Sequence, residues 1–449
     1  MKASVHIETM GCQMNVADTE RAVTSLRAAG YRLEESAQVA DVVLFNTCSV
    51  RARAAQKVFN RIGEVRKSRN GNDPIFGVMG CVAQLEGSAL FDRTSKIDMV
   101  VGTQATDRLP AMVERVFSGE DEVIDLGGRA DDEFWRVVPT ARHSPYVAFV
   151  PIIEGCNKFC TYCIVPFSRG REKSRLASDI IAEVHRLRDE GYREVHLIGQ
   201  NVNSYRPRSE HGLEGFVGAT PFSRLLRSVA ATGVERIKFT TSFPRDFHAD
   251  IVAAIDENEN LCNWVHLPVQ SGSDRVLRAM RRGYKRDGYL RRVESIKNAN
   301  RRLALTSDVI VGFPGETADD FEQTMSLVVR CQYDSLYIFK YSPRPGTPAF
   351  GLANEVTEDE KRDRFLALDR LQKEAQRRVY NDYVGRDVRV LVEKASARSG
   401  EDMTGHSTCH KVVNFRGERS LAGKEVTVRI TAAKPNSLYG VAKTGLSLS

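Results

Sequence analysis

The first part of the chain alternates short apolar, β-branched runs with amphipathic helical stretches. The apolar runs at residues 5–7, 41–45, 75–79 and 99–102 predict strands, and helical patterns such as residues 17–29 lie between them. This alternation is typical of a parallel sheet covered by helices. We therefore expect a doubly wound α/β domain over residues 1–125.

The same alternation resumes in the middle of the chain. Strands are predicted at residues 147–153, 194–198, 236–240, 265–269, 304–311 and 335–341. Six βα units favour a partial (β/α)6 barrel, which we place at residues 142–375.

The last part of the chain has a different periodicity. A charged helical stretch at residues 358–383 leads to runs that alternate at period two, at residues 388–392 and 425–430. This pattern predicts a small antiparallel β-barrel at residues 376–446. The expected fold class is thus α/β, with three domains in series.

Composition narrows the functional classes. The first residues carry charge where a signal peptide is apolar, and no apolar run is long enough to span a membrane. We expect a cytoplasmic protein that is a monomer and does not bind membranes. The net charge of +7 weakly favours a polyanionic partner. Nine cysteines in a large chain favour metal binding or catalysis over disulfides.

Cys156, Cys160 and Cys163 form a CxxxCxxC motif in the loop after the first strand of the central domain. Three thiolates in one loop can each bind one iron of a four-iron cluster, which leaves the fourth iron open. The alternative is a structural zinc site, which needs a fourth ligand. His143 is the nearest candidate for that ligand, and it lies on the far side of a whole strand.

Cys12, Cys48 and Cys81 each follow a predicted strand of the first domain, next to Gly11 and Gly80 in two cases. The carboxyl ends of parallel strands share one edge of a sheet, where ligands bind, so these cysteines should converge. The alternative is that each is a small buried hydrophobic residue.

The remaining three cysteines do not belong to such a group. Cys262, Cys331 and Cys409 are interpreted as structural. His406, Cys409 and His410 lie within five residues, but no fourth ligand completes a metal site.

The CxxxCxxC loop resembles the radical S-adenosylmethionine superfamily, and the N-terminal cysteines resemble its methylthiotransferase branch. Within that branch, the segments around the first two cysteines and an RGRE segment resemble the tRNA-2-methylthio-N6-dimethylallyladenosine synthases. The resemblance covers essentially the whole chain, in the segments MGCQMN (10–15), NTCSVR (46–51), RGRE (169–172), LIGQN (197–201), HLPVQSGS (266–273), VGFPGE (311–316) and YSPRPGT (341–347).

The resemblance implies a cofactor set and a reaction. Cys156, Cys160 and Cys163 are expected to hold a [4Fe-4S] cluster that binds S-adenosylmethionine and cleaves it to a 5′-deoxyadenosyl radical. That radical would take hydrogen from C2 of N6-isopentenyladenosine at position 37 of tRNA. A second [4Fe-4S] cluster on the other three cysteines would supply sulfur, and another S-adenosylmethionine its methyl group. The resemblance assigns no catalytic residue beyond these ligands.

Further partners and contacts follow from the same resemblance. The enzyme would need an electron donor such as flavodoxin or ferredoxin and a source of sulfur. Gly199 and Gln200 end one barrel strand and Gln270 and Ser271 another, so these four are candidate S-adenosylmethionine contacts. Ordinary turn chemistry would explain the same residue types.

Two segments are candidate RNA contacts. Between Arg275 and Arg302 the chain carries eleven Lys or Arg residues against two acidic ones, a density suited to phosphates. A solvated pair of helices would look the same. The last domain resembles the TRAM barrel of RNA-modifying enzymes, with eleven basic residues against seven acidic from residue 381 onward, and Phe415 and Tyr439 are candidates for base stacking.

The chain departs from the family pattern in places. His406, His410 and Lys411 stand where relatives usually have Arg, Asn and Arg, and Leu176 replaces a Pro. The effect of His406, His410 and Lys411 on the RNA contact is left open by the sequence.

Two classes of alternative remain open. A relative acting on threonylcarbamoyl-adenosine or on a ribosomal-protein aspartate would differ beside Cys12 and Cys48. A non-catalytic iron–sulfur or zinc scaffold that binds RNA would need the cysteines but no S-adenosylmethionine.

Overall fold

The computed structural model describes residues 2–49, 54–69, 72–94, 96–128, 135, 138–397 and 399–443. Val50 and Arg51 of the NTCSVR segment and the end of the expected last domain, residues 444–446, lie outside these ranges. No helix in the described ranges is both long enough and apolar enough to cross a membrane.

The N-terminal sheet has six parallel strands in the order β2-β1-β3-β4-β5-β6. The order reverses between β1 and β3, as in other doubly wound sheets, where the crevice at the carboxyl ends binds ligands. The strands are β1 (Ser4–Met10), β2 (Arg32–Leu33), β3 (Val42–Thr47), β4 (Ile75–Gly80), β5 (Met99–Val101) and β6 (Val123–Asp125). The predicted doubly wound sheet is confirmed, with two short strands added.

Helices cover both faces of this sheet because successive strand residues point to opposite sides. Val43 and Phe45 pack with α2, α3 and α4 in one core, whereas Val42 and Leu44 pack with α1 and α5 in another. The helices are α1 (Gln13–Ala28), α2 (Ala54–Ser68), α3 (Cys81–Glu86), α4 (Ala89–Arg93) and α5 (Leu109–Phe117).

The central domain contains six parallel βα units. Its strands form two three-stranded sheets, β11-β10-β7 and β12-β13-β14, and a parallel bridge between Ile237 and Leu261 connects them. The strands are β7 (Val147–Pro151), β10 (Glu194–Ile198), β11 (Arg236–Phe239), β12 (Trp264–His266), β13 (Ala304–Val311) and β14 (Ser335–Lys340). No pairing joins β7 to β14 among the described residues, so the barrel is partial, as predicted.

Helices lie around the barrel, and the longer ones bury their apolar sides against its strands. They are α6 (Val165–Arg169), α7 (Ala177–Asp189), α8 (Pro221–Ala230), α9 (Ala249–Glu257), α10 (Asp274–Ala279), α11 (Arg286–Lys297), α12 (Ala318–Cys331) and α13 (Glu358–Asn381). A two-stranded ribbon of β8 (Ile153–Glu154) and β9 (Lys173–Ser174) lies beside the cysteine loop.

The C-terminal strands close into a five-stranded barrel in the order β15-β16-β17-β19-β18. The strands are β15 (Asp387–Ala395), β16 (Asp402–Ser407), β17 (Val412–Arg416), β18 (Glu425–Ala433) and β19 (Leu438–Ala442). All pairs are antiparallel except β17 with β19, which are parallel.

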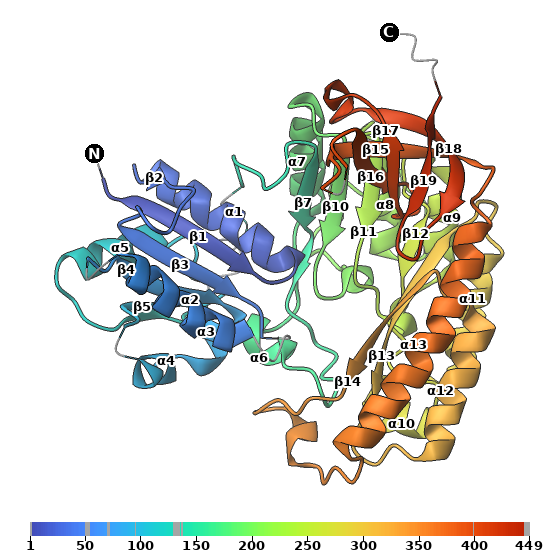
Figure 1. The fold of residues 1–449 in the computed structure, drawn as a ribbon, viewed down its shortest axis with the longest axis horizontal. Helices are drawn as coiled ribbons and strands as arrows, with labels where there is room; N and C mark the ends of the chain where they lie inside the picture. Colours follow the sequence, from blue (N-terminus) through green and yellow to red (C-terminus); the bar gives the residue numbers. More distant parts are fainter. Residues whose placement is uncertain are drawn as a thin grey trace.

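The two smaller domains contact different parts of the central barrel, with the C-terminal barrel above its strands and the N-terminal domain beside β7 (Figure 1). The C-terminal barrel covers the amino ends of the strands, where Trp264 and Ala304 join its core. The N-terminal domain lies near the carboxyl ends, where Thr240 contacts Gln13 of α1 at 3.2 Å. Ligands of such barrels bind at the carboxyl ends, so the N-terminal domain faces the end expected to hold the site.

Candidate active site

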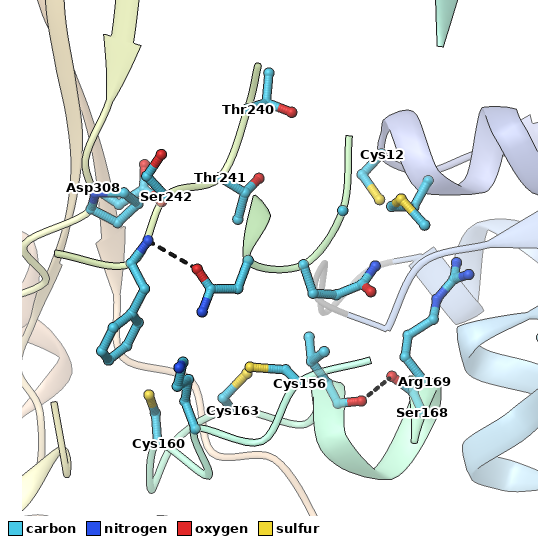
Figure 2. Close-up of a pocket in the computed structure, with 18 of the residues that line it drawn as sticks. Cys12, Cys156, Cys160, Cys163, Ser168, Arg169, Thr240, Thr241, Ser242 and Asp308 are labelled. Carbon is cyan, nitrogen blue, oxygen red and sulfur yellow. Dashed lines mark hydrogen bonds between the residues drawn. The ribbon is translucent and has the colours of Figure 1, made fainter. Parts of the chain in front are cut away.

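One cavity of about 350 Å³ lies between the edge of the N-terminal sheet and the carboxyl ends of the barrel strands. Figure 2 shows Cys12 on one side of it and the barrel's cysteine loop on the other. Both groups of three line it: Cys12, Cys48, Cys81, Cys156, Cys160 and Cys163. Two sets of cysteines from different domains therefore face a common space.

The N-terminal cysteines follow three adjacent strands of the sheet. Cys12 precedes α1, Cys48 follows β3 and Cys81 begins α3 directly after β4. The structure brings these three together at the sheet edge, although they are far apart in sequence. We call them the N-terminal trio.

Asparagine side chains fix the backbone beneath the N-terminal trio. The Asn15 side-chain oxygen accepts hydrogen bonds from the Cys12 backbone N–H at 3.2 Å and from the Cys12 thiol at 3.4 Å. The Asn15 amide donates to the Asn46 side chain at 2.9 Å. Gly80 has φ +91, and a Cβ there would lie 2.3 Å from the Asn46 oxygen. Only glycine fits this turn.

Cys12 and Cys81 differ in acidity. A hydrogen bond with Cys48 is the main cause that lowers the pKa of Cys12 to about 6, and the charge of Arg169 adds to it. Burial raises the pKa of Cys81, and the same arginine opposes that rise. A thiolate at Cys12 is the form that binds metal, so this position is prepared for a ligand.

The barrel cysteines lie on one irregular loop between β8 and α6. Gly155 precedes them with φ +79, and a Cβ there would lie 2.1 Å from the Arg171 carbonyl oxygen. The Gly155 N–H donates to the Gln200 side-chain oxygen at 2.7 Å, and the Cys156 N–H donates to the Gly170 carbonyl at 3.2 Å. Backbone contacts on both sides thus set the path of the loop. We call Cys156, Cys160 and Cys163 the barrel trio.

In the barrel trio, burial has the largest effect on the pKa values of Cys156 and Cys163. Burial raises the pKa of Cys156, and it raises the pKa of Cys163 to about 12. Among described residues, no three His, Cys, Asp or Glu side chains are arranged to hold a single metal ion. Thiols that bind separate irons of a cubane need wider spacing than ligands of one ion.

Arg169 connects the two trios. It lies on α6, directly after the barrel trio's loop, and its Nε donates to the Cys81 sulfur at 3.3 Å. Its other nitrogens bind Asp18 of α1 at 2.6 Å and Glu154 of β8 at 3.0 Å. The guanidinium is buried and paired with two carboxylates, an arrangement that requires all partners to be in place. Arg169 therefore connects the N-terminal domain to the central domain at the cavity.

The predicted S-adenosylmethionine contacts divide into two groups. Gly199, Gln200 and Gln270 line the cavity. A Cβ on Gly199 would lie 2.4 Å from the Ile153 side chain, so glycine is required there. Ser271 is not among the lining residues, and its hydroxyl instead lies 3.4 Å from the Thr324 hydroxyl of α12.

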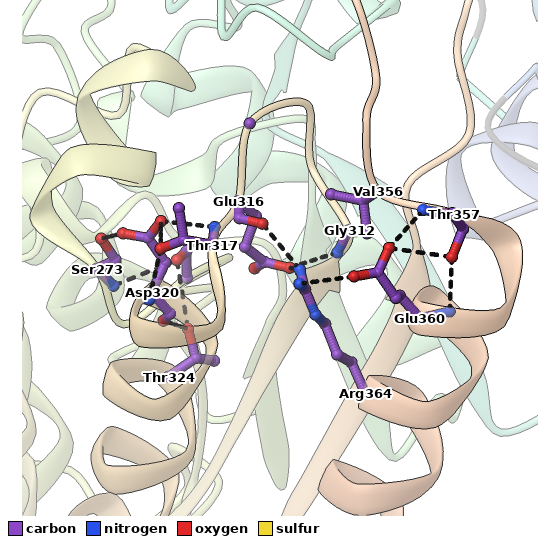
Figure 3. Close-up of polar contacts among 12 residues, drawn as sticks. Ser273, Gly312, Glu316, Thr317, Asp320, Thr324, Val356, Thr357, Glu360 and Arg364 are labelled. Atoms are coloured by element: carbon purple, nitrogen blue, oxygen red, sulfur yellow. Dashed lines mark hydrogen bonds and ion pairs between the residues drawn. The ribbon is translucent and has the colours of Figure 1, made fainter.

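The turn after β12 is fastened by polar contacts with the start of α12 (Figure 3). Ser273 donates to buried Asp320 at 2.5 Å, and the Gly272 N–H donates to Thr324 at 2.9 Å. Thr317 caps α12 and also donates to Asp320 at 2.7 Å. These contacts hold Gln270, whose φ is +73, at the cavity wall.

Sequence reasoning missed several cavity residues. Thr240, Thr241 and Ser242 follow β11 and line the cavity, together with Asn201 and Asp308. The sequence does place small polar residues directly after this strand. That pattern could have predicted them as site residues, because ligand contacts concentrate at the carboxyl ends of barrel strands.

The comparisons identify families for all three parts of the chain. Residues 4–102 match the uncharacterized protein family UPF0004, residues 150–328 match the radical SAM superfamily and residues 381–443 match the TRAM domain. The tRNA-2-methylthio-N(6)-dimethylallyladenosine synthase of Solibacter usitatus (strain Ellin6076) is 45% identical over 97% of each chain. The synthase of Koribacter versatilis (strain Ellin345) is 43% identical, again over 97% of each chain. The chain belongs to this synthase family.

A solved structure shares the fold of the synthase family at low sequence identity. The radical S-adenosylmethionine methyltransferase from Kitasatospora setae aligns with a TM-score of 0.56 and 12% identity. The alignment covers 78% of this chain and 75% of that one.

The structure contradicts one stacking prediction for the C-terminal barrel of this synthase family member. Phe415 is fully buried in the barrel core, so the prediction that it can stack on a base is wrong. The Tyr439 hydroxyl donates to Asp402 at 3.1 Å.

The residues that depart from the synthase pattern lie against the central domain. Lys411 is buried and pairs with Asp334, which precedes β14. His410 stacks on His406 with ring centroids 4.8 Å apart and lies 5.7 Å from the Trp264 ring. His410 and Lys411 therefore form part of the contact between the two domains.

The basic segment between Arg275 and Arg302 is only partly available to a ligand. Arg292 and Arg301 donate to backbone carbonyls, and Arg275 pairs with Asp320. Exposed basic residues without an ion pair in the described structure remain at Arg278, Arg281, Lys285, Arg291 and Lys297.

Proposed function

We propose that this chain is a tRNA methylthiotransferase that converts N6-isopentenyladenosine at position 37 to its 2-methylthio derivative. The two cysteine trios that face one cavity carry this proposal. The names of relatives at 40–45% identity, which cover at least 97% of this chain, support the same substrate.

The barrel trio fits a [4Fe-4S] cluster. Its three thiols line the cavity, so they suit three irons and leave one iron without a protein ligand. When bound, this cluster would supply an open iron for S-adenosylmethionine and the electron that cleaves it. Gln200 holds the loop at Gly155, so it fixes the position of the thiols.

The N-terminal trio fits a second [4Fe-4S] cluster for the same reason, because it too offers three thiols at the cavity. Cys12 has a lowered pKa, and Cys81 accepts a hydrogen bond from Arg169 at 3.3 Å. A charged donor favours the thiolate form of its acceptor. This trio would hold the group that delivers sulfur to the substrate across the cavity.

Residues between the trios would position cofactor and substrate. Gly199, Gln200 and Gln270 are the proposed S-adenosylmethionine contacts on the cavity wall. Thr240, Thr241 and Ser242 offer hydroxyl groups on the same wall. Glycine at position 199 packs closely against Ile153 and so keeps its backbone at the cavity wall.

The reaction requires further partners. We propose tRNA bearing N6-isopentenyladenosine as substrate, a reductant such as flavodoxin or ferredoxin and a separate source of sulfur. The proposed location is the cytoplasm. The proposed state is a monomer.

Alanine substitutions test whether the barrel trio serves S-adenosylmethionine cleavage and the N-terminal trio serves sulfur transfer. In the reconstituted full-length protein, Cys156→Ala should abolish formation of 5′-deoxyadenosine, because the open-iron cluster loses a ligand. Cys12→Ala should keep S-adenosylmethionine cleavage but lose 2-methylthio product, measured by nucleoside mass spectrometry of the tRNA. Cys331→Ala, at a buried cysteine of α12, is the control that should retain both.

Product formation by Cys12→Ala would argue against a second cluster. Cleavage without any 2-methylthio product in wild type, on tRNA that carries the isopentenyl group, would reject the proposed substrate. No cleavage by wild type would favour a non-catalytic scaffold.

A further inference from the structure

Arg282 is a buried arginine at the cavity wall, shortly after α10. Its Nη1 donates to the Cys160 sulfur at 3.4 Å and to the Tyr162 hydroxyl at 3.3 Å. Its Nε donates to the Tyr284 hydroxyl at 3.1 Å and its Nη2 to the Pro268 carbonyl at 2.9 Å. Four partners thus fix the guanidinium beside one sulfur of the barrel trio.

Among the residues that the structure describes, no carboxylate pairs with the charge of Arg282. Its hydrogen bonds all go to the Cys160 sulfur, two phenols and a backbone carbonyl. A phenol is neutral at pH 7, so the hydroxyls of Tyr162 and Tyr284 do not balance this charge. The face of Phe243, 4.3 Å away, stabilises the cation only weakly. Cys160 is therefore the one contact that can carry a full negative charge.

Arg169 at the other trio provides the contrast. It also donates to a cysteine sulfur, Cys81, but Asp18 and Glu154 balance its charge. A buried arginine without a counter-ion is costly, so the surroundings of Arg282 are built for an anion that binds there. A thiolate-ligated iron–sulfur cluster is such an anion.

We propose that Arg282 is a positioning residue that raises the reduction potential of the cluster held by Cys156, Cys160 and Cys163. This inference rests on the proposed function, because it requires a cluster at that trio. One-electron reduction adds a negative charge to the cluster, with the electron coming from the external donor. A buried positive charge and a hydrogen bond to a ligand sulfur both favour the reduced state.

Redox titration of the reconstituted full-length protein tests this role. The triple variant with Ala at Cys12, Cys48 and Cys81 isolates the barrel cluster, and electron paramagnetic resonance measures its reduced fraction without S-adenosylmethionine. Arg282→Met keeps an unbranched side chain but removes the charge and the N–H donors. It should lower the reduction equilibrium constant at least tenfold, a shift of about 59 mV for a one-electron couple.

Two further variants at position 282 distinguish the effect of the positive charge on the potential from the effect of side-chain shape. Arg282→Lys keeps the positive charge and should remain near the wild-type potential, whereas Arg282→Gln, which retains an N–H donor, should fall between. Arg278→Met, at an exposed arginine of α10, is the matched control and should leave the potential unchanged.

The outcomes distinguish this inference from the proposed function. Full iron content with an unchanged potential in Arg282→Met would overturn the inference and leave the proposed function intact. An unchanged potential with weaker S-adenosylmethionine binding would overturn it too, because Arg282 would then hold the cofactor's carboxylate. Failure of the parent variant to bind iron at the barrel trio would contradict the proposed function itself.

Discussion

At the scale of single residues, the cavity depends on backbone positions as much as on thiols. Gly155 turns the chain directly before Cys156, with φ +79 and the Arg171 carbonyl beneath it. A side chain there would meet backbone, which cannot move aside as a flexible side chain can. The position of the first barrel cysteine therefore depends on a residue that has no reactive group.

Gly155→Ala should prevent assembly of the barrel cluster. The added Cβ would lie 2.1 Å from the Arg171 carbonyl oxygen and displace the loop. We expect the iron content of the reconstituted protein to fall by about half, because one of two four-iron clusters is lost.

Gly191→Ala is the control for this prediction. Gly191 also has a positive φ, +90, but a Cβ there meets nothing within 4 Å. It should cost about 1 kcal/mol of stability from backbone strain and retain full iron. Equal iron content in both variants would show that the clash at Gly155 is unimportant.

Sequence alone revealed the cysteines but not the contacts that Arg169 and Arg282 make with them. A CxxxCxxC loop has a recognisable spacing, and three strand ends can be aligned by pattern. Arg282 lies inside a run of basic residues that resembles a solvated surface, and its burial depends on the path of the chain after α10. Its role comes from tertiary contacts, which leave no local sequence signal.

At the scale of elements, strand positions were more predictable than element ends. The helix expected at residues 17–29 begins at Gln13, because Cys12 acts as its N-cap with Asn15, a role that thiols rarely have. The strand expected at residues 265–269 ends at His266, since Pro268 cannot donate to a sheet. The strand expected at residues 147–153 is divided between β7 and β8.

The turn between β16 and β17 docks the C-terminal barrel on the central domain. Lys411 lies there, buried between Asp334 and the rings of Tyr380 and Tyr383, at 5.5 and 4.8 Å. Burial acts to lower the pKa of Lys411, but Cys409 and Asp334 outweigh it and raise the pKa. The charge and its ion pair are therefore present at neutral pH and would be lost only in strong alkali.

Lys411→Met should destabilise the protein by about 3 kcal/mol, because it leaves a largely buried carboxylate unpaired. Chemical denaturation at neutral pH measures the change. Lys424→Met, at an exposed lysine of the same barrel, should change stability by less than about 0.5 kcal/mol. A loss confined to RNA binding, without a loss of stability, would contradict a role in docking.

At the scale of the whole molecule, the position of each of the three domains determines whether it contributes to the cavity. The N-terminal sheet and the central barrel meet at their carboxyl strand ends and enclose the cavity, whereas the C-terminal barrel covers the opposite end of the central strands (Figure 1). Each architecture was predictable from its periodicity. The relative placement was not, because it depends on buried contacts such as Arg169 with Asp18, across 151 positions of sequence.

The most direct test counts iron and acid-labile sulfide in three anaerobically reconstituted proteins: wild type, the N-terminal trio replaced by Ala and the barrel trio replaced by Ala. Two independent cubanes predict about eight irons in wild type and about four in each triple variant. About four irons in wild type, unchanged when the N-terminal trio is replaced, would show that Cys12, Cys48 and Cys81 hold no cluster.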